Sequence, residues 1–117
     1  MSSVSAAEWQ VDNNNYTSVI ANDANDGDII EFLSGNYETD STININKELT
    51  LKANGEVNLS AKGNFNVLSI SKSNVEINGF NIIGVESPVG YAGIYLAGTS
   101  PLSNITIYNN HISNIGF

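Results

Sequence analysis

Short apolar-x-apolar units recur along this chain at nearly regular intervals, and no other feature limits the possible fold as much. They fall into three interleaved series, which we name A, B and C. Series A comprises, at nearly equal steps, Ile43–Ile45, Leu68–Ile70 and Ile94–Leu96. Series B comprises, at steps that lengthen along the chain, Ile30–Phe32, Leu49–Leu51, Val75–Ile77 and Ile105–Ile107. Series C comprises Val57–Leu59, Ile82 and Ile112.

Each unit alternates as a β-strand does when one of its faces is buried. Gly, Asn and Ser, which tolerate tight turns, lie between the units. Three interleaved series indicate three strands per turn of a solenoid whose turns stack about 4.8 Å apart. The sequence therefore predicts an all-β, parallel β-helix of about three coils after a first partial one, right-handed as parallel crossovers generally are. The expected core positions are Ile45, Leu51, Ile70, Ile77, Leu96 and Ile107.

The connections between the predicted strands differ in length. Those from B to C are short and rich in Asn and Gly ("KANGE", "NGFN", "YNNH"). Stacked Asn side chains there can pass amide hydrogen bonds along the helix axis. The C-to-A connection grows to "GVESPVGYAG" and the A-to-B connection to "AGTSPLSN". In a solenoid, such insertions form loops on particular faces, and those faces often bind ligands.

The two ends of the predicted stack differ. Tyr16, Val19, Ile20 and Ala24 have helical spacing, which predicts an amphipathic helix over 17–25 that covers the first coil. With a short strand around Trp9, residues 8–28 form an N-terminal cap, and 29–117 form the coils. At the other end the pattern still runs when the sequence stops. The open coil either continues in a longer protein, is buried by another chain, including a second copy, or is covered by Ile115 and Phe117.

The N-terminal residues 1–7 are either a signal-peptide remnant or residues introduced for expression. Ser5 and Ala7 are the small residues that signal peptidase prefers before a cut at Glu8, although a merely polar N-terminus has the same composition. Three Asn-x-Ser/Thr sequons are candidate glycosylation sites and are compatible with export. They begin at Asn15, Asn58 and Asn104.

Composition excludes several classes of partner. The chain has four Lys, no Arg and a formal charge of −8, which argues against nucleic acid and anionic membrane surfaces. No apolar run approaches the roughly 20 residues of a membrane span, so we expect no membrane insertion. The absence of Cys excludes disulfides and thiolate metal sites.

The stretch "NDANDGDIIEFLSGNYETDSTININKELTLKANG" resembles the opening of adhesin-like surface proteins of methanogenic archaea. "SNVEINGFNIIG" and "SNITIYNNHISNIG" resemble coil repeats of the same pectin-lyase-like superfamily. The resemblance covers roughly residues 8–117 and implies a right-handed β-helix with an N-terminal cap helix. It also implies an exported, surface-displayed protein that contacts carbohydrates or cell surfaces. Activity does not follow from it, because this superfamily contains lyases, hydrolases, epimerases, tailspikes and adhesins.

The residues give little support to an enzyme. The superfamily's pectate lyases use calcium and a basic Arg, and this chain has no Arg; Lys47 and Lys72 are expected to be solvated turn residues. Its glycoside hydrolases need two carboxylates that flank the scissile bond. Glu76 points outward with Thr50 and Thr106 as stacked neighbours, so we expect no catalytic residue. The alternative is a truncated or degenerate polysaccharide-active domain.

Metal binding is expected to be weak or absent. His111 is the single His, expected in a B-to-C turn, and one imidazole without partners makes a poor transition-metal site. Asp23, Asp26 and Asp28 surround Gly27, but an EF-hand placed on that glycine would need ligands from Ala24 and Leu33. We therefore expect a polar turn, and weak calcium binding in another geometry stays open.

Carbohydrate binding is one candidate function. Sugars stack on aromatic rings, and three rings are candidates. Tyr91 lies in the long C-to-A connection, Tyr95 points outward from a predicted strand, and Tyr108 lies at the start of the last B-to-C turn. Alternatively, these amphipathic rings simply cover aliphatic neighbours. A third interpretation is structural: the domain is the base of a surface stalk and binds nothing. We expect a non-catalytic, secreted, adhesin-like module at the cell surface.

Overall fold

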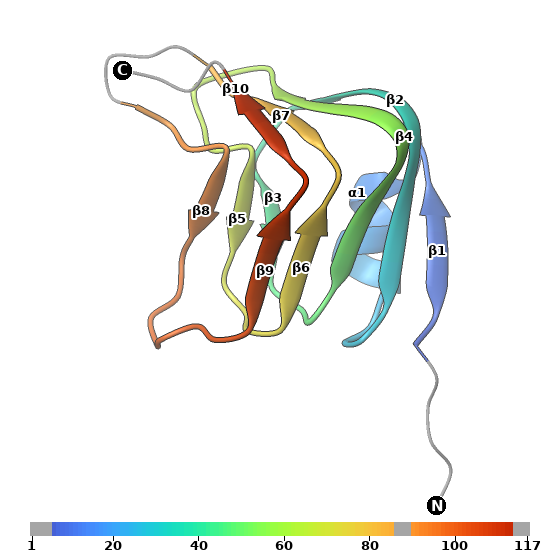
Figure 1. Cartoon of the computed structure of the whole chain (residues 1–117), viewed down its shortest axis with the longest axis vertical. Helices are drawn as coiled ribbons and strands as arrows, with labels where there is room; N and C mark the ends of the chain where they lie inside the picture. The colour runs from blue at the N-terminus through green and yellow to red at the C-terminus, as the bar shows by residue number, and fades with distance from the viewer. Residues whose placement is uncertain (1–5, 86–89, 114–117) are drawn as a thin grey trace, which may run out of the picture.

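The computed structural model describes residues 6–85 and 90–113, which wind as a right-handed parallel β-solenoid of about four turns (Figure 1). The larger of two parallel sheets has the order β1-β2-β4-β6-β9. It also contains β7, which pairs with β4, and β10, which pairs with β7; the smaller sheet has the order β3-β5-β8. The strands are β1 Glu8–Val11, β2 Ile29–Thr39, β3 Ile43–Ile45, β4 Thr50–Ala61, β5 Leu68–Ile70, β6 Val75–Asn78, β7 Asn81–Ile83, β8 Ile94–Leu96, β9 Ile105–Tyr108 and β10 His111–Ser113. The predicted fold class is confirmed.

The strand register confirms most of the predicted repeats. In the smaller sheet, Ile43 pairs with Leu68 and Leu68 with Ile94. One predicted step was wrong: Ile30 of β2 pairs with Leu51, and not with Leu49 as the repeat had indicated. A slip of two residues preserves which face of a strand is buried. For this reason the inward positions of β2 were assigned correctly despite the wrong register.

In the first coils, the predicted B and C strands join into one long strand each, β2 and β4. A bulge replaces the expected turn, because Gly55 and Glu56 of β4 lie opposite the single Ser34 of β2. Gly55 has φ +89°, a conformation that residues with a Cβ rarely adopt. In the later coils the strand is interrupted at the corresponding position. Gly79 (φ +92°) lies between β6 and β7, and Asn109 (φ +56°) lies between β9 and β10.

The core fills the space inside the coils. Ile45, Leu51, Ile70 and Ile77 are fully buried, as predicted. The sequence analysis missed an aromatic cluster in the same interior, formed by Tyr16, Phe32, Tyr37 and Phe80. Phe32 and Phe80 meet edge to face with their ring centroids 5.0 Å apart, an arrangement that aromatic pairs favour.

Leu96 and Ile107 were predicted to be core residues, and for these two the prediction was wrong. They continue the rows of Ile70 and Ile77 in β8 and β9. However, their side chains are 52% and 40% exposed. β8 and β9 are the last strands of their rows, so no described strand stacks on these two residues from the far side.

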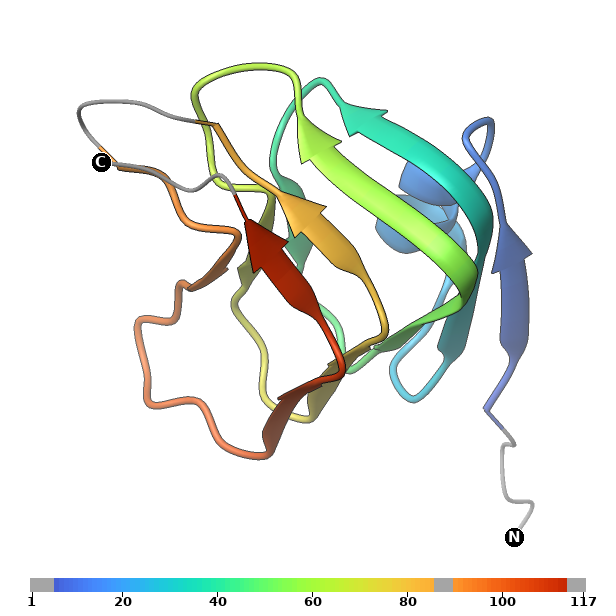
Figure 2. The ribbon, with the colours of Figure 1, turned by 45° about the horizontal axis from the view of Figure 1, so that its top comes forward.

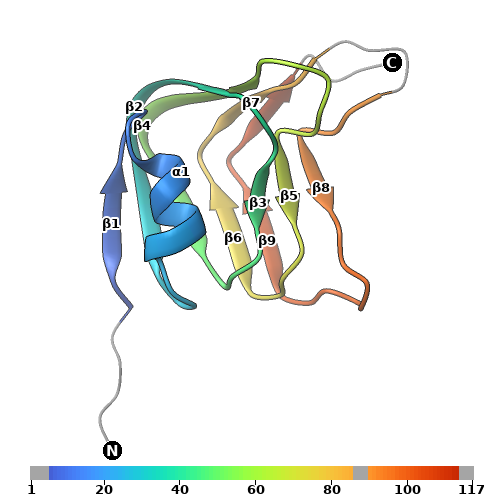
Figure 3. The same cartoon turned by 180° about the vertical axis from the view of Figure 1, so that it is seen from behind.

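The N-terminal cap has the predicted composition and slightly different bounds. Its helix, which we call the cap helix, comprises α1 (Tyr16–Ser18) and the continuing π-helical turn η1 (Val19–Asp23), whereas 17–25 was predicted. Tyr16, Val19, Ile20 and Ala24 are buried. The cap helix stands beside β3, on the same side of the solenoid as the smaller sheet (Figure 3). Figure 2 shows it at one end of the stack, with β8 and β10 at the other.

Side-chain amide ladders run along the solenoid axis, as predicted. Asn81 Nδ2 donates to Asn58 Oδ1 (2.8 Å), and Asn58 Nδ2 donates to Asn36 Oδ1 (2.7 Å). In a second ladder, Asn104 Nδ2 donates to Asn74 Oδ1 (2.7 Å). The ladders lie on the C strands and just before the B strands, and not in the B-to-C turns where they were expected.

Candidate functional site

The outer face of the smaller sheet carries an aromatic and polar depression. Asn44, Ser69 and Tyr95 are in register on β3, β5 and β8 and form one row across this face. A depression of about 490 Å³ lies over the row. Its lining combines the rings of Tyr95 and Phe65 with the hydroxyls and amides of Ser41, Thr42, Asn44 and Asn66.

A second depression, of about 560 Å³, lies between the cap helix and β3. The cap helix contributes Tyr16, Thr17, Ile20 and Ala21, and the segment before and through β3 contributes the other side. Both depressions are lined by Asp40, Ser41, Thr42 and Asn44. They therefore adjoin, and we call the two together the outer trough.

Of the three candidate tyrosines, Tyr95 is the one that lines the outer trough. It is 50% exposed and lines the outer trough on a strand, where backbone pairing fixes its position. Phe65, which the sequence analysis did not single out, lines the same depression from the connection between β4 and β5. An aromatic residue within the Gly- and Asn-rich stretch "KGNFN" was the available signal.

The three candidate tyrosines are not brought together. Tyr91 is half-buried just before β8 and does not line the outer trough. Tyr108 lies on β9 of the larger sheet, where its hydroxyl accepts a hydrogen bond from Asn78 Nδ2 (3.0 Å) and donates to Glu76 Oε2 (3.3 Å). Desolvation, together with the adjacent Glu76 carboxylate, raises the pKa of Tyr108. Its ring is thus part of a polar row.

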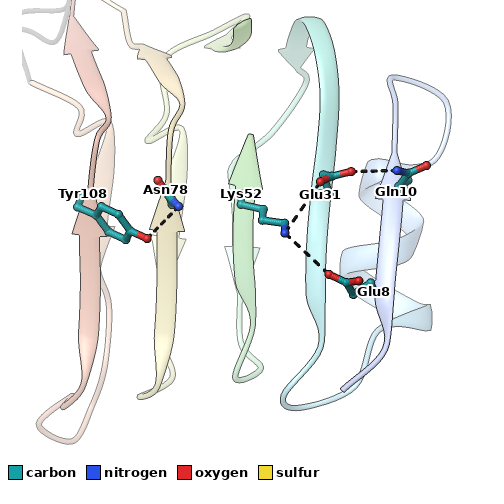
Figure 4. Close-up of polar contacts among 6 residues, drawn as sticks. All are labelled: Glu8, Gln10, Glu31, Lys52, Asn78 and Tyr108. Atoms are coloured by element: carbon teal, nitrogen blue, oxygen red, sulfur yellow. Dashed lines mark hydrogen bonds and ion pairs between the residues drawn. The ribbon is translucent and has the colours of Figure 1, made fainter. Parts of the chain in front are cut away.

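That polar row crosses the outer face of the larger sheet (Figure 4). Lys52 Nζ lies 3.8 Å from Glu8 Oε1 and 4.0 Å from Glu31 Oε2, and Gln10 Nε2 donates to Glu31 Oε1 (2.9 Å). A depression of about 620 Å³ lies beside these side chains. Because such exposed ion pairs contribute only about 0–1 kcal/mol each, we interpret the row as a solvated surface with modest stabilising value.

The acidic residues near Gly27 mostly make structural contacts. Asp28 is buried, and its carboxylate accepts hydrogen bonds from the backbone N–H groups of Asn25 (2.8 Å) and Ala7 (3.0 Å) and from Trp9 Nε1 (2.9 Å). These contacts, that of Asn25 above all, lower the pKa of Asp28. Within residues 6–85 and 90–113, no group of three or more His, Cys, Asp or Glu is placed to hold a metal ion. Calcium binding near these residues stays a prediction.

The residues considered for catalysis are placed as follows. Glu76 pairs in register with Thr50 and Thr106, as predicted. Lys47 was wrongly expected to be solvated: its Nζ donates to the carbonyls of Ala24 (2.7 Å) and Ala21 (3.3 Å) at the end of the cap helix. His111 begins strand β10, in register with Asn81, and does not lie in a turn. The absence of catalytic activity stays a prediction.

The three sequons differ in how their amides are used. Asn58 is held in the first ladder through both its nitrogen and its oxygen. Asn104 is exposed, and its nitrogen donates to Asn74. Asn15 Oδ1 accepts a hydrogen bond from the N–H of Asp12 (2.8 Å). Glycosylation stays a prediction, and the signal-peptide interpretation concerns a segment whose first five residues, like Ile115 and Phe117, lie outside the described residues.

Comparison with family models, with curated proteins and with solved structures gives no match to this chain. Among the described residues, no helix is long and apolar enough to cross a membrane. Any functional conclusion therefore depends on the geometry of the outer trough and on the general chemistry of its side chains.

Proposed function

We propose that this chain is a non-catalytic, adhesin-like module that binds glycans at a cell surface. The observation that carries the proposal is the half-exposed ring of Tyr95, set with Phe65 over a trough of hydroxyls and amides. A ring can stack on the apolar face of a sugar, and amides and hydroxyls can bond its hydroxyl groups.

The scaffold supports this function. Asn44, Ser69 and Tyr95 stand on paired strands of the smaller sheet, so their spacing is set by the β-stack at about 4.8 Å per strand. Sites built on such strands hold their side chains more accurately than sites built on loops. The strand row beneath the depression is therefore preformed, whereas Asp40, Ser41, Thr42, Phe65 and Asn66 reach it from connections.

The test is an array of plant and microbial cell-wall glycans, probed with the purified protein with and without calcium. We expect binding that is lost in Tyr95→Ala. Tyr108→Ala is the matched control, because Tyr108 is also an exposed tyrosine but lies on the other sheet. Equal loss in both variants, or retention in Tyr95→Ala, would remove the outer trough as the binding site.

A structural role is the second candidate, and the Asn ladders favour it. Continuous amide hydrogen bonds along the axis, such as Asn36–Asn58–Asn81, suit the base of a surface stalk. If the domain is the base of a stalk, we expect it to bind none of the glycans on the array. A truncated or degenerate polysaccharide-active domain instead predicts new reducing ends or unsaturated products when the same glycans are incubated with the protein.

Self-association through the last coil belongs to the same proposal. Leu96, Ile107 and Ile112 are exposed apolar residues on β8, β9 and β10. A second copy of the chain would cover them. Sedimentation velocity over a range of concentrations tests this: a dimer that Ile107→Asp returns to monomer supports it, and a monomer at every concentration refutes it.

A further inference from the structure

We propose that the outer trough binds the end of an uncharged polysaccharide chain, with the terminal sugar held between the cap helix and β3. This inference rests on the proposed glycan-binding function and adds to it the class of ligand and the mode of binding.

The trough is open along the smaller sheet and closed at one end. Over β3, β5 and β8 its floor is the strand row that ends at Tyr95. At β3 it meets the cap helix, which lines the depression with Tyr16, Thr17, Ile20 and Ala21. Figure 3 shows the helix beside β3, in the place that a further strand of the smaller sheet would occupy. The cap-helix residues thus form the end wall of the trough, and we call this wall the barrier.

The barrier is anchored to the first coil. Lys47, in the connection between β3 and β4, donates from Nζ to the carbonyls of Ala24 and Ala21. Tyr16 packs edge to face on Tyr37 inside the solenoid, with ring centroids 5.3 Å apart. A chain that runs along the trough from Tyr95 would therefore end against a wall that is held in place.

The closed end offers hydrogen-bonding groups for a sugar. Thr17, Thr42, Asn44 and Asn46 bring hydroxyls and amides to its lining. Thr39, which also lines this depression, is 2% exposed, and its Oγ1 has no hydrogen-bond partner within the described structure. A buried hydroxyl without a partner is costly. A polyhydroxylated ligand that reached it would relieve that cost.

The charge of the trough selects uncharged sugars. Among the described residues that line either depression, Asp40 is the one carboxylate, and none is a Lys or a His. Lys62 lies nearby but is paired, with Nζ 3.0 Å from Asp40 Oδ1. Uronates, sulfates and phosphates would therefore bring a negative charge to a carboxylate without a free cation to receive it, on a chain of net charge −8.

The test measures stoichiometry by titration calorimetry. The probes are cellohexaose, xylohexaose, laminarihexaose and maltohexaose, longer chains of the same linkages, the ring α-cyclodextrin, and hexagalacturonic acid. We expect an uncharged linear probe to bind, with one protein per chain however long the chain becomes, and no binding of hexagalacturonic acid. If maltohexaose binds, α-cyclodextrin, which has no chain end, should not.

Two variants locate the terminal sugar. Ala21→Trp fills the depression at the cap helix and should weaken binding on the order of tenfold or more, whereas Ser18→Trp, an exposed position of α1 outside the lining, should not. Thr39→Val, which removes the unpartnered hydroxyl at nearly constant shape, should lower affinity without lowering the melting temperature.

The outcomes separate this inference from the function that it extends. If binding depends on Tyr95 but the number of protein molecules per glycan chain grows with chain length, or if binding survives Ala21→Trp, then only the binding of chain ends is refuted. Tyr95-dependent binding of hexagalacturonic acid refutes the uncharged class alone. Silence of every probe refutes both the inference and the glycan-binding function.

Discussion

Ile77 and Ile107 occupy the same position in successive coils and differ in burial, so substituting each by Ala tests the register and the exposure of the last coil together. Ile77 is fully buried, with Leu51 on one side and Ile107 on the other. Ile107 is 40% exposed. Both changes remove the same three carbon atoms, so the difference between them reports on the surroundings alone.

The expected costs follow from burial. Three buried carbons are worth about 0.8 kcal/mol each, or about 2.4 kcal/mol in all. At Ile77 a closed cavity adds to this, which places the total at about 3–4 kcal/mol, within the range for such substitutions. At Ile107 about three-fifths of the transfer energy applies and the cavity opens to solvent, so we expect about 1–1.5 kcal/mol.

The assay is urea unfolding followed by circular dichroism, with the m-values compared to confirm that all variants unfold alike. Thr106→Ala, an exposed position next to Ile107, is the control and should change stability by no more than about 0.5 kcal/mol. A small cost at Ile77 would refute the register. The comparison is made at a protein concentration at which sedimentation shows a monomer. Equal costs at Ile77 and Ile107 under that condition would show that the last coil is covered within one chain and would refute its exposure.

Three further predictions concern polar contacts. Asp28→Asn should destabilise the protein at pH 7, and melting temperatures across pH should show this deficit disappearing as acid is added. Because contacts in the folded state lower the pKa of Asp28, the ionised carboxylate stabilises the fold fully above its unfolded-state pKa of about 3.9 and progressively less as the pH falls through its folded-state pKa. Asn58→Ala should cost about 1–2 kcal/mol by breaking an amide ladder, whereas the exposed Asn64→Ala should be nearly neutral in the same unfolding assay. Lys47→Met, which keeps the apolar stem but removes the donors to Ala21 and Ala24, should speed amide exchange in the cap helix by several-fold and leave the exchange of β6 unchanged.

The fold could be predicted from sequence because its signal is repeated. Alternating apolar residues such as Ile43–Ile45 and Leu68–Ile70 recur at almost constant intervals, so each unit supports the assignment of the next. The wrong register of Ile30 shows the limit of this signal. An alternation of period two is unchanged by a slip of two residues, so the apolar pattern does not choose between Leu49 and Leu51 as the partner of Ile30.

The candidate site was only partly predictable, for a different reason. Tyr95 was found because it stands on a strand of the repeat. Phe65 lies in a connection, and the cap helix contributes Thr17 and Ala21 from a distant part of the sequence. Nothing local to these residues indicates that they share a surface. Likewise, the contact of Lys47 with the helix carbonyls joins segments that are far apart in the sequence.

The coils of this solenoid grow in length while their strands remain aligned. Along the larger sheet, Ile30, Leu51, Ile77 and Ile107 stack in register, and each step along the sequence is longer than the one before it. All of the added residues enter the connections, where extra length costs little because loop-closure entropy grows only slowly with loop length. The inward residues supply most of the thermodynamic stability, and the connections hold the differences in length between the coils. The outside of this solenoid can therefore change one connection at a time while the stacked interior keeps its dimensions.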